Sequence, residues 1–161
     1  MFSEAMPHGQ RRAGLGNVMM TRVEADGVVF VQASDIQLLD DEPISVILDW
    51  MPAILLVSGP PLYRGLNAEQ LAAARERALR LARSVPCCII DHHLLRSRSG
   101  LQWLDELRQE TGGNTQCAAD YMGVDRRLLE ADRALLYDTE PVAPGWHESY
   151  QRPSLFCPGE M

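Results

Sequence analysis

The feature that most constrains the fold is an alternation of short apolar runs with longer amphipathic segments. The apolar runs at 53–57 and 87–90 have the length and composition of buried parallel strands. Apolar residues in the segment between them recur at helical spacing, at Leu71, Ala74 and Ala78. Because parallel strands need long crossover connections, this alternation predicts a mostly parallel sheet with right-handed crossovers, and therefore an α/β fold.

Local signals predict where the elements begin and end. In chain order we expect a β-hairpin at 18–23 and 28–32, a helix at 43–51, a strand at 53–57, a helix at 67–84, a strand at 87–90, a helix at 100–110, a strand at 115–118 and a helix at 126–137. Residues 140–161 hold four of the ten prolines. We therefore expect a folded domain over 1–139 and an irregular tail over 140–161.

Length and charge exclude several classes of protein. A chain of 161 residues has the length of one domain. The formal net charge of −7 disfavours a nucleic-acid-binding module, which would present a basic patch to phosphates. The longest uncharged stretch, 50–63, is interrupted by Gly and Pro and is too short to cross a bilayer. The first residues lack the pattern of a signal peptide, so we expect a cytoplasmic protein without membrane contact.

Polar residues follow the predicted strands at their carboxyl ends, where open α/β sheets bind their ligands. These residues are Asp35, Ser58, Asp91, His92, His93 and Asp120. A hydrolytic metal site needs imidazoles and carboxylates that converge from several loops. The available set is His8, Asp35, Asp91, His92 and His93. The alternatives are that Asp35 caps the next helix, that His8 is a solvated loop residue and that backbone groups satisfy the histidine pair.

Several short motifs carry a resemblance that spans nearly the whole chain. They are SEAMPHG at 3–9, ASDIQ at 33–37, SGPPLY at 58–63, IDHHLLR at 90–96, CAADYMG at 117–123 and GWHE at 145–148. Together they resemble the C-terminal half of an uncharacterised, largely archaeal group of metallo-β-lactamase-fold proteins. The resemblance implies half of an αββα sandwich, in which two αβ layers pack face to face with the metal site at one rim.

The resemblance also implies the roles of the candidate residues. His8 matches a histidine of the third metal motif, and Asp35 matches the aspartate that bridges two ions and on which catalysis depends. His92 or His93 matches the last metal-binding histidine, and His93 is slightly preferred. Asp91 or Asp120 would orient a histidine through its other ring nitrogen. The implied activity is hydrolysis of an ester, phosphodiester or amide by a divalent metal, with zinc expected and two ions in a complete family member.

The sequence departs from this family in one large respect. Complete members carry H-x-H-x-D-H in an N-terminal half, and that motif occurs nowhere in these 161 residues. The resemblance then implies a chain that is inactive alone and leaves one sheet face uncovered. Three explanations are open. The missing half could be a separate chain, the start site could be misplaced so that the gene prediction is truncated, or this chain could be a degenerate copy.

Two other functions compete with the metallo-hydrolase. The chain could be a non-catalytic association half that pairs with an N-terminal-half chain or with itself, as the missing motif suggests. Alternatively, Asp91-His92-His93 resembles the strand-end motif of the DHH phosphoesterases, named for Asp-His-His. Those enzymes also need an aspartate pair on an earlier strand, whereas residues 34–37 supply only Asp35.

Overall fold

The computed structural model describes residues 1–10, 14–146 and 148 of the chain. It forms two compact units, Met1–Ala131 and Asp132–Met161. The first unit contains the sheet and the helices that cover it, and the second contains the helix α5 (Arg133–Thr139). Most of the predicted irregular tail lies outside the described residues. The assignment of 1–139 to a partial metallo-β-lactamase-type domain stays a prediction.

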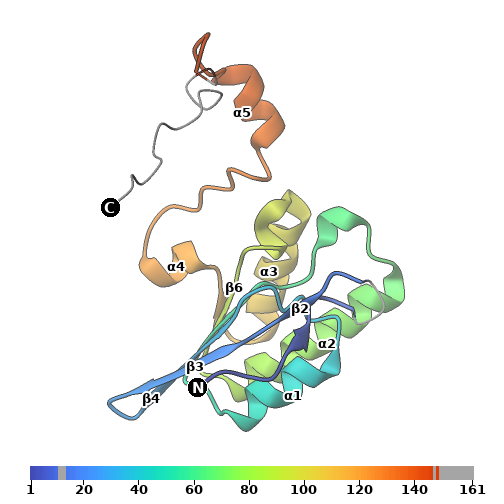
Figure 1. The fold of residues 1–161 in the computed structure, drawn as a ribbon, viewed down its shortest axis with the longest axis vertical. Coiled ribbons are helices and arrows are strands. Elements are labelled where there is room, and N and C mark those ends of the chain that lie inside the picture. Colours follow the sequence, from blue (N-terminus) through green and yellow to red (C-terminus); the bar gives the residue numbers. More distant parts are fainter. Residues whose placement is uncertain (11–13, 147, 149–161) are drawn as a thin grey trace, which may run out of the picture. The chain divides into compact units, whose positions relative to one another are not determined.

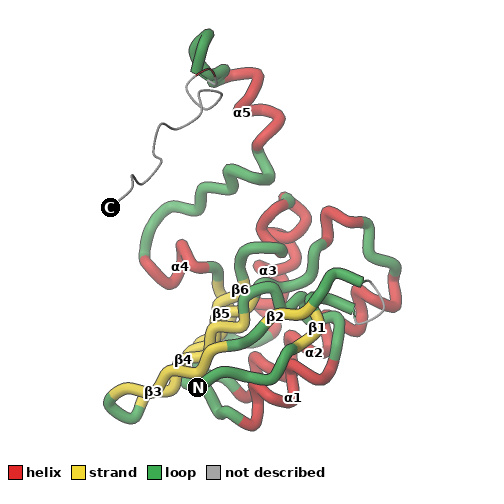
Figure 2. The backbone as a smooth tube through the Cα atoms, in the orientation of Figure 1, coloured by secondary structure: helices red, strands yellow, loops and turns green. Residues whose placement is uncertain are grey.

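The first unit is built on a five-stranded, mainly parallel sheet (Figures 1 and 2). Its strands lie side by side in chain order: β3 (Thr21–Ala25), β4 (Val28–Ala33), β5 (Ile54–Val57), β6 (Cys87–Ile90) and β7 (Thr115–Gln116). The β3–β4 hairpin is antiparallel and the other pairs are parallel. The predicted α/β class and the hairpin at its start are confirmed. A second, two-stranded sheet pairs β1 (Met6–Pro7) with β2 (Asn17–Val18).

Three helices connect the parallel strands, and all of them lie on one side of the sheet (Figure 2). They are α1 (Asp41–Asp49), α2 (Ala68–Ser84) and α3 (Arg98–Glu110). The strand order explains this placement, because each crossover steps to the next strand in the same direction. Right-handed crossovers that all step in one direction must all pass over the same face. Among the described residues, no helix has the length and apolar character needed to cross a membrane.

The helices begin at side chains that satisfy the free N–H groups of the first turn. At α2, the Asn67 carboxamide accepts a hydrogen bond from the Gln70 N–H at 2.8 Å, and the Gln70 side chain accepts one from the Asn67 N–H at 2.9 Å. This is the capping pair that the sequence predicts. Asp40 and Ser97 cap α1 and α3 through their side-chain oxygens. These caps fix the helix starts close to the predicted positions.

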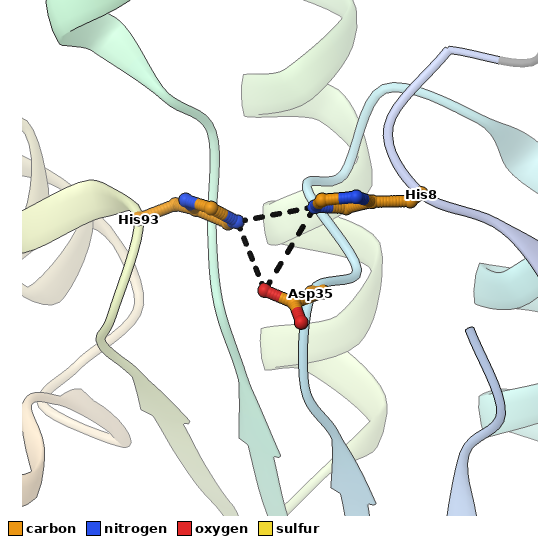
Figure 3. Close-up of side chains that lie close together, drawn as sticks. All are labelled: His8, Asp35 and His93. Atoms are coloured by element: carbon orange, nitrogen blue, oxygen red, sulfur yellow. Dashed lines mark hydrogen bonds and ion pairs between the residues drawn. The ribbon is translucent and has the colours of Figure 1, made fainter. Parts of the chain in front are cut away.

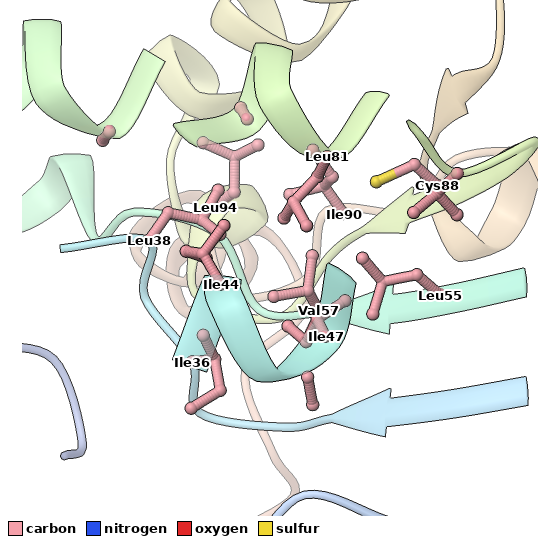
Figure 4. Close-up of a cluster of buried hydrophobic side chains, with 14 of the residues drawn as sticks. Ile36, Leu38, Ile44, Ile47, Leu55, Val57, Leu81, Cys88, Ile90 and Leu94 are labelled. Carbon is pink, nitrogen blue, oxygen red and sulfur yellow. The ribbon is translucent and has the colours of Figure 1, made fainter. Parts of the chain in front are cut away.

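The core lies between the sheet and these helices (Figure 4). Alternate residues of each strand point into it, as the period of two in a β-strand requires. Val31, Leu55, Val57, Cys88 and Ile90 are at most 1% exposed, and they pack against apolar residues of α1 and α2 such as Ile44, Ile47 and Leu81. We call this side of the sheet the covered face.

The other side, which we call the open face, has no crossover helix. The strand register places Phe30, Ile54 and Cys87 in one row across it, and all three are only partly buried. The next row on the same face contains Leu56 and Ile89. Apolar side chains therefore line both faces of the sheet, although the crossover helices pack on only one.

Two predicted elements near the end of the first unit are wrong in their bounds. The strand expected at 115–118 ends at Gln116, because the Cys117 side chain caps a short helix, α4 (Ala118–Met122). The helix expected at 126–137 is shorter and begins later in the chain: it is α5, which spans Arg133–Thr139. Residues before it are not helical because Arg126 reaches back to Asp120 and Asp105 and Leu128 is buried in the core.

Candidate metal centre

The carboxyl ends of β4, β5 and β6 lie at one edge of the sheet, and each leads directly into a candidate residue. Asp35 follows β4, Ser58 follows β5, and His92 and His93 follow β6. The short strand β1 delivers His8 to the same place from the N-terminus. The structure therefore brings together candidates that lie up to 85 residues apart in the chain.

Ser58 ties the loops of this edge to one another. Its hydroxyl oxygen accepts a hydrogen bond from the Asp35 N–H at 2.7 Å, and its carbonyl oxygen accepts one from the Leu94 N–H at 3.0 Å. Ser58 is only 2% exposed, so little water competes for these bonds. Asp35 itself has a positive φ of 64°, a conformation that aspartate tolerates better than most residues. Ser58 thus holds the backbone that aims the Asp35 carboxylate.

His92 and His93 occupy opposite environments although they are consecutive. The His92 side chain is 51% exposed, whereas the His93 side chain is 7% exposed. His92 has a φ of 48°, and the chain turns there so that His93 points inward. Burial, with a further contribution from the His92 and Arg96 charges, lowers the pKa of His93 to about 4. The His93 imidazole is therefore neutral at pH 7, as a metal ligand must be.

His8 approaches the site closely because the residue after it is glycine. Gly9 has a φ of 81°, and a Cβ atom at this position would meet Gln37 Oε1 at 2.5 Å. The Gln37 side chain is buried, and its Nε2 atom lies 3.5 Å from His93 Nε2. A larger residue than glycine would push the His8 loop away from His93.

Three ligand atoms converge in this arrangement (Figure 3). The distance from His93 Nε2 to Asp35 Oδ1 is 3.0 Å, and the distance between the Nε2 atoms of His8 and His93 is 3.4 Å. His8 Nε2 lies 3.8 Å from Asp35 Oδ1. We call these three residues the triad. It is the one group of potential metal ligands of this kind that the described residues form.

The spacing of the triad matches that of ligands on one ion. Zinc ligands bind at about 2.0–2.2 Å, so two ligand atoms of a tetrahedral site lie roughly 3.3–3.6 Å apart. The three distances of the triad, 3.0, 3.4 and 3.8 Å, bracket that separation. Two imidazoles and a carboxylate are also a ligand set that zinc accepts. The residues present therefore fit a divalent metal.

His92 lies beside the triad, on the solvent side. Its Nε2 atom is 3.4 Å from Asp35 Oδ1 and 3.3 Å from Arg96 Nη2. Arginine is only a donor, so it is the lone pair of His92 Nε2 that accepts this hydrogen bond. That lone pair is the one a metal would need. At His93 Nε2 the competing donor is the uncharged Gln37 amide, 3.5 Å away, and not a guanidinium. Of the two histidines that the sequence leaves open, the structure places His93 in the triad.

Asp91 and Asp120 lie near the site, but their hydrogen bonds within the described part of the chain hold other groups. The Asp91 carboxylate accepts from the backbone N–H groups of His92 and Ala118, at 2.7 and 2.8 Å. The Asp120 carboxylate accepts from Arg108 and Arg126, and the hydrogen bonds with Arg126 lower its pKa to about 2. Both acids thus fix α4 and the loop that carries His92, and not a histidine ring.

A cavity of about 250 Å³ opens beside the centre. Its walls are formed by Ser34, Leu56, Val57, Ser58, Asp91, His92 and Ala118. Leu56 belongs to the open face, so the cavity connects that face with the edge that carries the triad. The cavity provides room for part of a ligand next to Ser34 and His92.

Four residues of the site lie in the quoted motifs, but the sequence assigns them no specific role. Ser58 and Tyr63 flank a Gly-Pro-Pro turn that explains them adequately. Arg96 could hold a phosphate or carboxylate, but an arginine at such a position more often belongs to a solvated surface, and Gln37 receives no role from its place in the ASDIQ motif. The structure places Tyr63 Oη 3.3 Å from His93 Nδ1 and Arg96 Nη1 3.3 Å from Tyr63 Oη. Only their positions relative to the histidines distinguish these residues from ordinary loop residues.

The chain is similar to archaeal proteins that are called UPF0282 proteins. A relative from Methanosarcina mazei is 47% identical over 152 residues, which are 94% of this chain and 50% of the relative. Relatives from Thermococcus onnurineus and Aeropyrum pernix are 33% and 32% identical; each match covers 86% of this chain, and 46% and 51% of the relative. The chain thus spans about half the length of the curated relatives it matches. No protein-family model and no solved structure matches it.

The relatives confirm the archaeal part of the expected resemblance. Their names state neither a fold nor an activity, so the metallo-β-lactamase relationship stays a prediction. Because the match covers only about half of each relative, any activity of the whole protein is a proposal.

Proposed function

We propose that the triad binds one divalent metal ion, with zinc as the expected ion, and that this centre hydrolyses its substrate. The observation that carries the proposal is the convergence of His8 Nε2, Asp35 Oδ1 and His93 Nε2 from three separate segments of the chain. Ligands that meet in this way need specific loops at each strand end, and Ser58 and Gly9 support those loops.

A catalytic metal site differs from a structural one in keeping an open position. The triad would hold the ion with three protein ligands, and the Asp35 side chain is 37% exposed, so water can reach the centre. When bound there, a divalent ion lowers the pKa of water toward about 7, which makes a nucleophile available at neutral pH. Asp35 Oδ1 faces the Nε2 atoms of both His8 and His93, at 3.8 and 3.0 Å. We assign catalysis to this carboxylate.

The fold supports a second layer on the open face. Its apolar rows would be buried if another αβ layer packed against them, as in a metallo-β-lactamase-type sandwich. The curated relatives are about twice as long as this chain, which leaves ample length for such a layer. In this proposal the second layer also brings further ligands to the centre, because the triad stands at the edge that both layers would share.

Metal content tests the proposal directly. We expect the chain, purified without chelator, to hold about one zinc per chain by elemental mass spectrometry, and His93→Ala or Asp35→Ala to hold almost none. His92→Ala is the matched control. The His92 imidazole lies beside the triad but outside it, so we expect this variant to retain zinc. Zinc content that is equal in the wild type and in both triad variants would refute the centre.

Turnover tests the catalytic assignment separately. We expect a zinc-loaded full-length protein, in which this chain is joined to the missing half, to cleave an activated ester or phosphodiester such as bis-p-nitrophenyl phosphate, and a chelator to stop the reaction. Asp35→Ala should abolish turnover. If Asp35→Ala retained zinc-dependent turnover, Asp35 would have no part in catalysis.

A further inference from the structure

Tyr63 and Arg96 form a connected pair against the back of the triad. Tyr63 belongs to the short helix η2 (Leu62–Arg64), and Arg96 ends the short helix η3 (Leu94–Arg96) that follows the histidines. Arg96 Nη1 donates to Tyr63 Oη at 3.3 Å, and the guanidinium lies over the Tyr63 ring at 5.9 Å. Tyr63 Oη lies 3.3 Å from His93 Nδ1, so the pair reaches the ring nitrogen opposite the triad.

The direction of these hydrogen bonds follows from the role of His93. A His93 that binds metal through Nε2 carries its proton on Nδ1, and this N–H donates to Tyr63 Oη. Arg96 is always a donor, so it also donates to Tyr63 Oη. The phenol oxygen then accepts two hydrogen bonds, and its own proton is left to donate to a third group. Tyr63 is 41% exposed, so a bound ligand can receive that proton.

Arg96 brings a positive charge that no carboxylate balances among the described residues. Its hydrogen-bond partners among the described residues are the neutral Tyr63 hydroxyl and the ring of His92. Of the five N–H groups of a guanidinium, these contacts use two. Three donors and the full charge therefore remain beside the centre, whereas Arg75, Arg77 and Arg126 are each paired with a carboxylate.

We propose that Arg96 and Tyr63 form an oxyanion subsite that binds the phosphate group of a phosphoester substrate. The inference rests on the proposed function in that the bound phosphate lies between this subsite and the ion of the triad. Phosphate fits better than carboxylate because three electropositive groups surround the position: the ion, the guanidinium and the phenol O–H. A phosphate group offers three acceptor oxygens and a charge of about −1.5 to −2 at neutral pH, whereas a carboxylate offers two oxygens and one charge.

Calorimetric titration with phenyl phosphate and with benzoate tests the subsite, because the two probes share a ring and differ in the anion. Both are added to the zinc-loaded and to the metal-free chain. We expect phenyl phosphate to bind more tightly than benzoate. Arg96→Gln should raise its Kd by about tenfold or more, and Tyr63→Phe by about threefold to tenfold. Arg83→Gln, which removes an exposed charge from the last turn of α2, should leave the Kd within about twofold.

The zinc affinity of the chain gives a second readout. It would not change if Tyr63 contributed only to the electrostatic attraction of the phosphate. Tyr63→Phe keeps the charge but removes the acceptor for His93 Nδ1–H, so we expect its zinc Kd to rise by about tenfold or more. Arg83→Gln should not change the zinc Kd. Circular dichroism confirms that each variant is folded before it is compared.

The outcomes separate this inference from the proposed function. Zinc binding by the triad with a phenyl phosphate Kd that does not depend on Arg96 would overturn the subsite and leave the metal centre standing. If the chain takes up no zinc but its phenyl phosphate binding depends on Arg96, the metal centre is overturned and the subsite stands. Benzoate binding as tight as that of phenyl phosphate, with equal loss in Arg96→Gln, would overturn the assignment to phosphate.

Discussion

The two faces of the sheet carry similar side chains but meet different surroundings. On the covered face, Leu55 and Val57 are at most 1% exposed beneath α1 and α2, whereas Ile54 and Leu56 of the same strand are only partly buried on the open face. Composition does not produce this difference, because β5 is apolar at every position. The sequential strand order produces it, since every right-handed crossover passes over one face.

The comparison also explains where the candidate centre lies. The triad stands at the carboxyl edge, where the covered face ends and the cavity beside Leu56 opens. Ser58, which positions Asp35, is only 2% exposed, while the Asp35 and His92 side chains remain accessible. A rigid covered face and an accessible edge are together what a metal centre needs: fixed ligands and an open position.

The largest expected difference between the faces lies in neighbouring leucines of β5. We expect Leu55→Ala to lower the free energy of unfolding by about 3 kcal/mol, because it leaves a cavity in the closed core. Leu56→Ala should cost about 1 kcal/mol, because Leu56 is partly exposed and borders an existing cavity. Urea unfolding of both variants measures the two values. Equal losses would mean that a second layer already buries the open face, for example in a dimer.

Acid should weaken the corner of the open face that α4 occupies. The hydrogen bonds with Arg126 depress the pKa of Asp120 from 3.8 to about 2. A carboxyl whose pKa is lowered in the folded state stabilises that state above its unfolded pKa. This stability is lost as the pH falls from about 4 to 2, and its size is about 2 kcal/mol.

The Asp120→Asn variant isolates this contribution. We expect the wild type to exceed the variant in unfolding free energy by about 2 kcal/mol at pH 5, and the gap to close near pH 2. Urea unfolding at a series of pH values measures it. A gap that stays constant down to pH 2 would show that the charge of Asp120 is not its source.

The smallest effect concerns a helix start on the covered side. Asn67→Ala removes the side-chain acceptor of the α2 capping box, and we expect a cost of about 1 kcal/mol. Hydrogen exchange should quicken in the first turn of α2 and stay unchanged in β5 and β6. Faster exchange throughout the sheet would mean that the covered face unfolds as one unit with this helix start.

Much of the fold could be predicted because its signals are local. The capping pair of Asn67 and Gln70 and the apolar run at 87–90 marked α2 and β6 almost to the residue. The prediction failed at 115–118, where Cys117 starts a short helix by a local cap, and at 126–137, where the outcome depends on contacts between distant side chains. Arg126 bonds to Asp105, 21 residues away, and such a partner leaves no periodic trace in the sequence.

The candidate site divides in the same way. The sequence alone determined that Asp35 and the histidine pair follow strand ends, and parallel strands present their carboxyl ends at one edge. It also named His8 as a candidate, but only the structure shows how the segment before the parallel sheet reaches that edge. It could not choose between His92 and His93, since that choice depends on a single backbone turn with a φ of 48°. Nor could it place Tyr63 and Arg96 against His93, because their roles depend on distances that exist only once three loops have packed together.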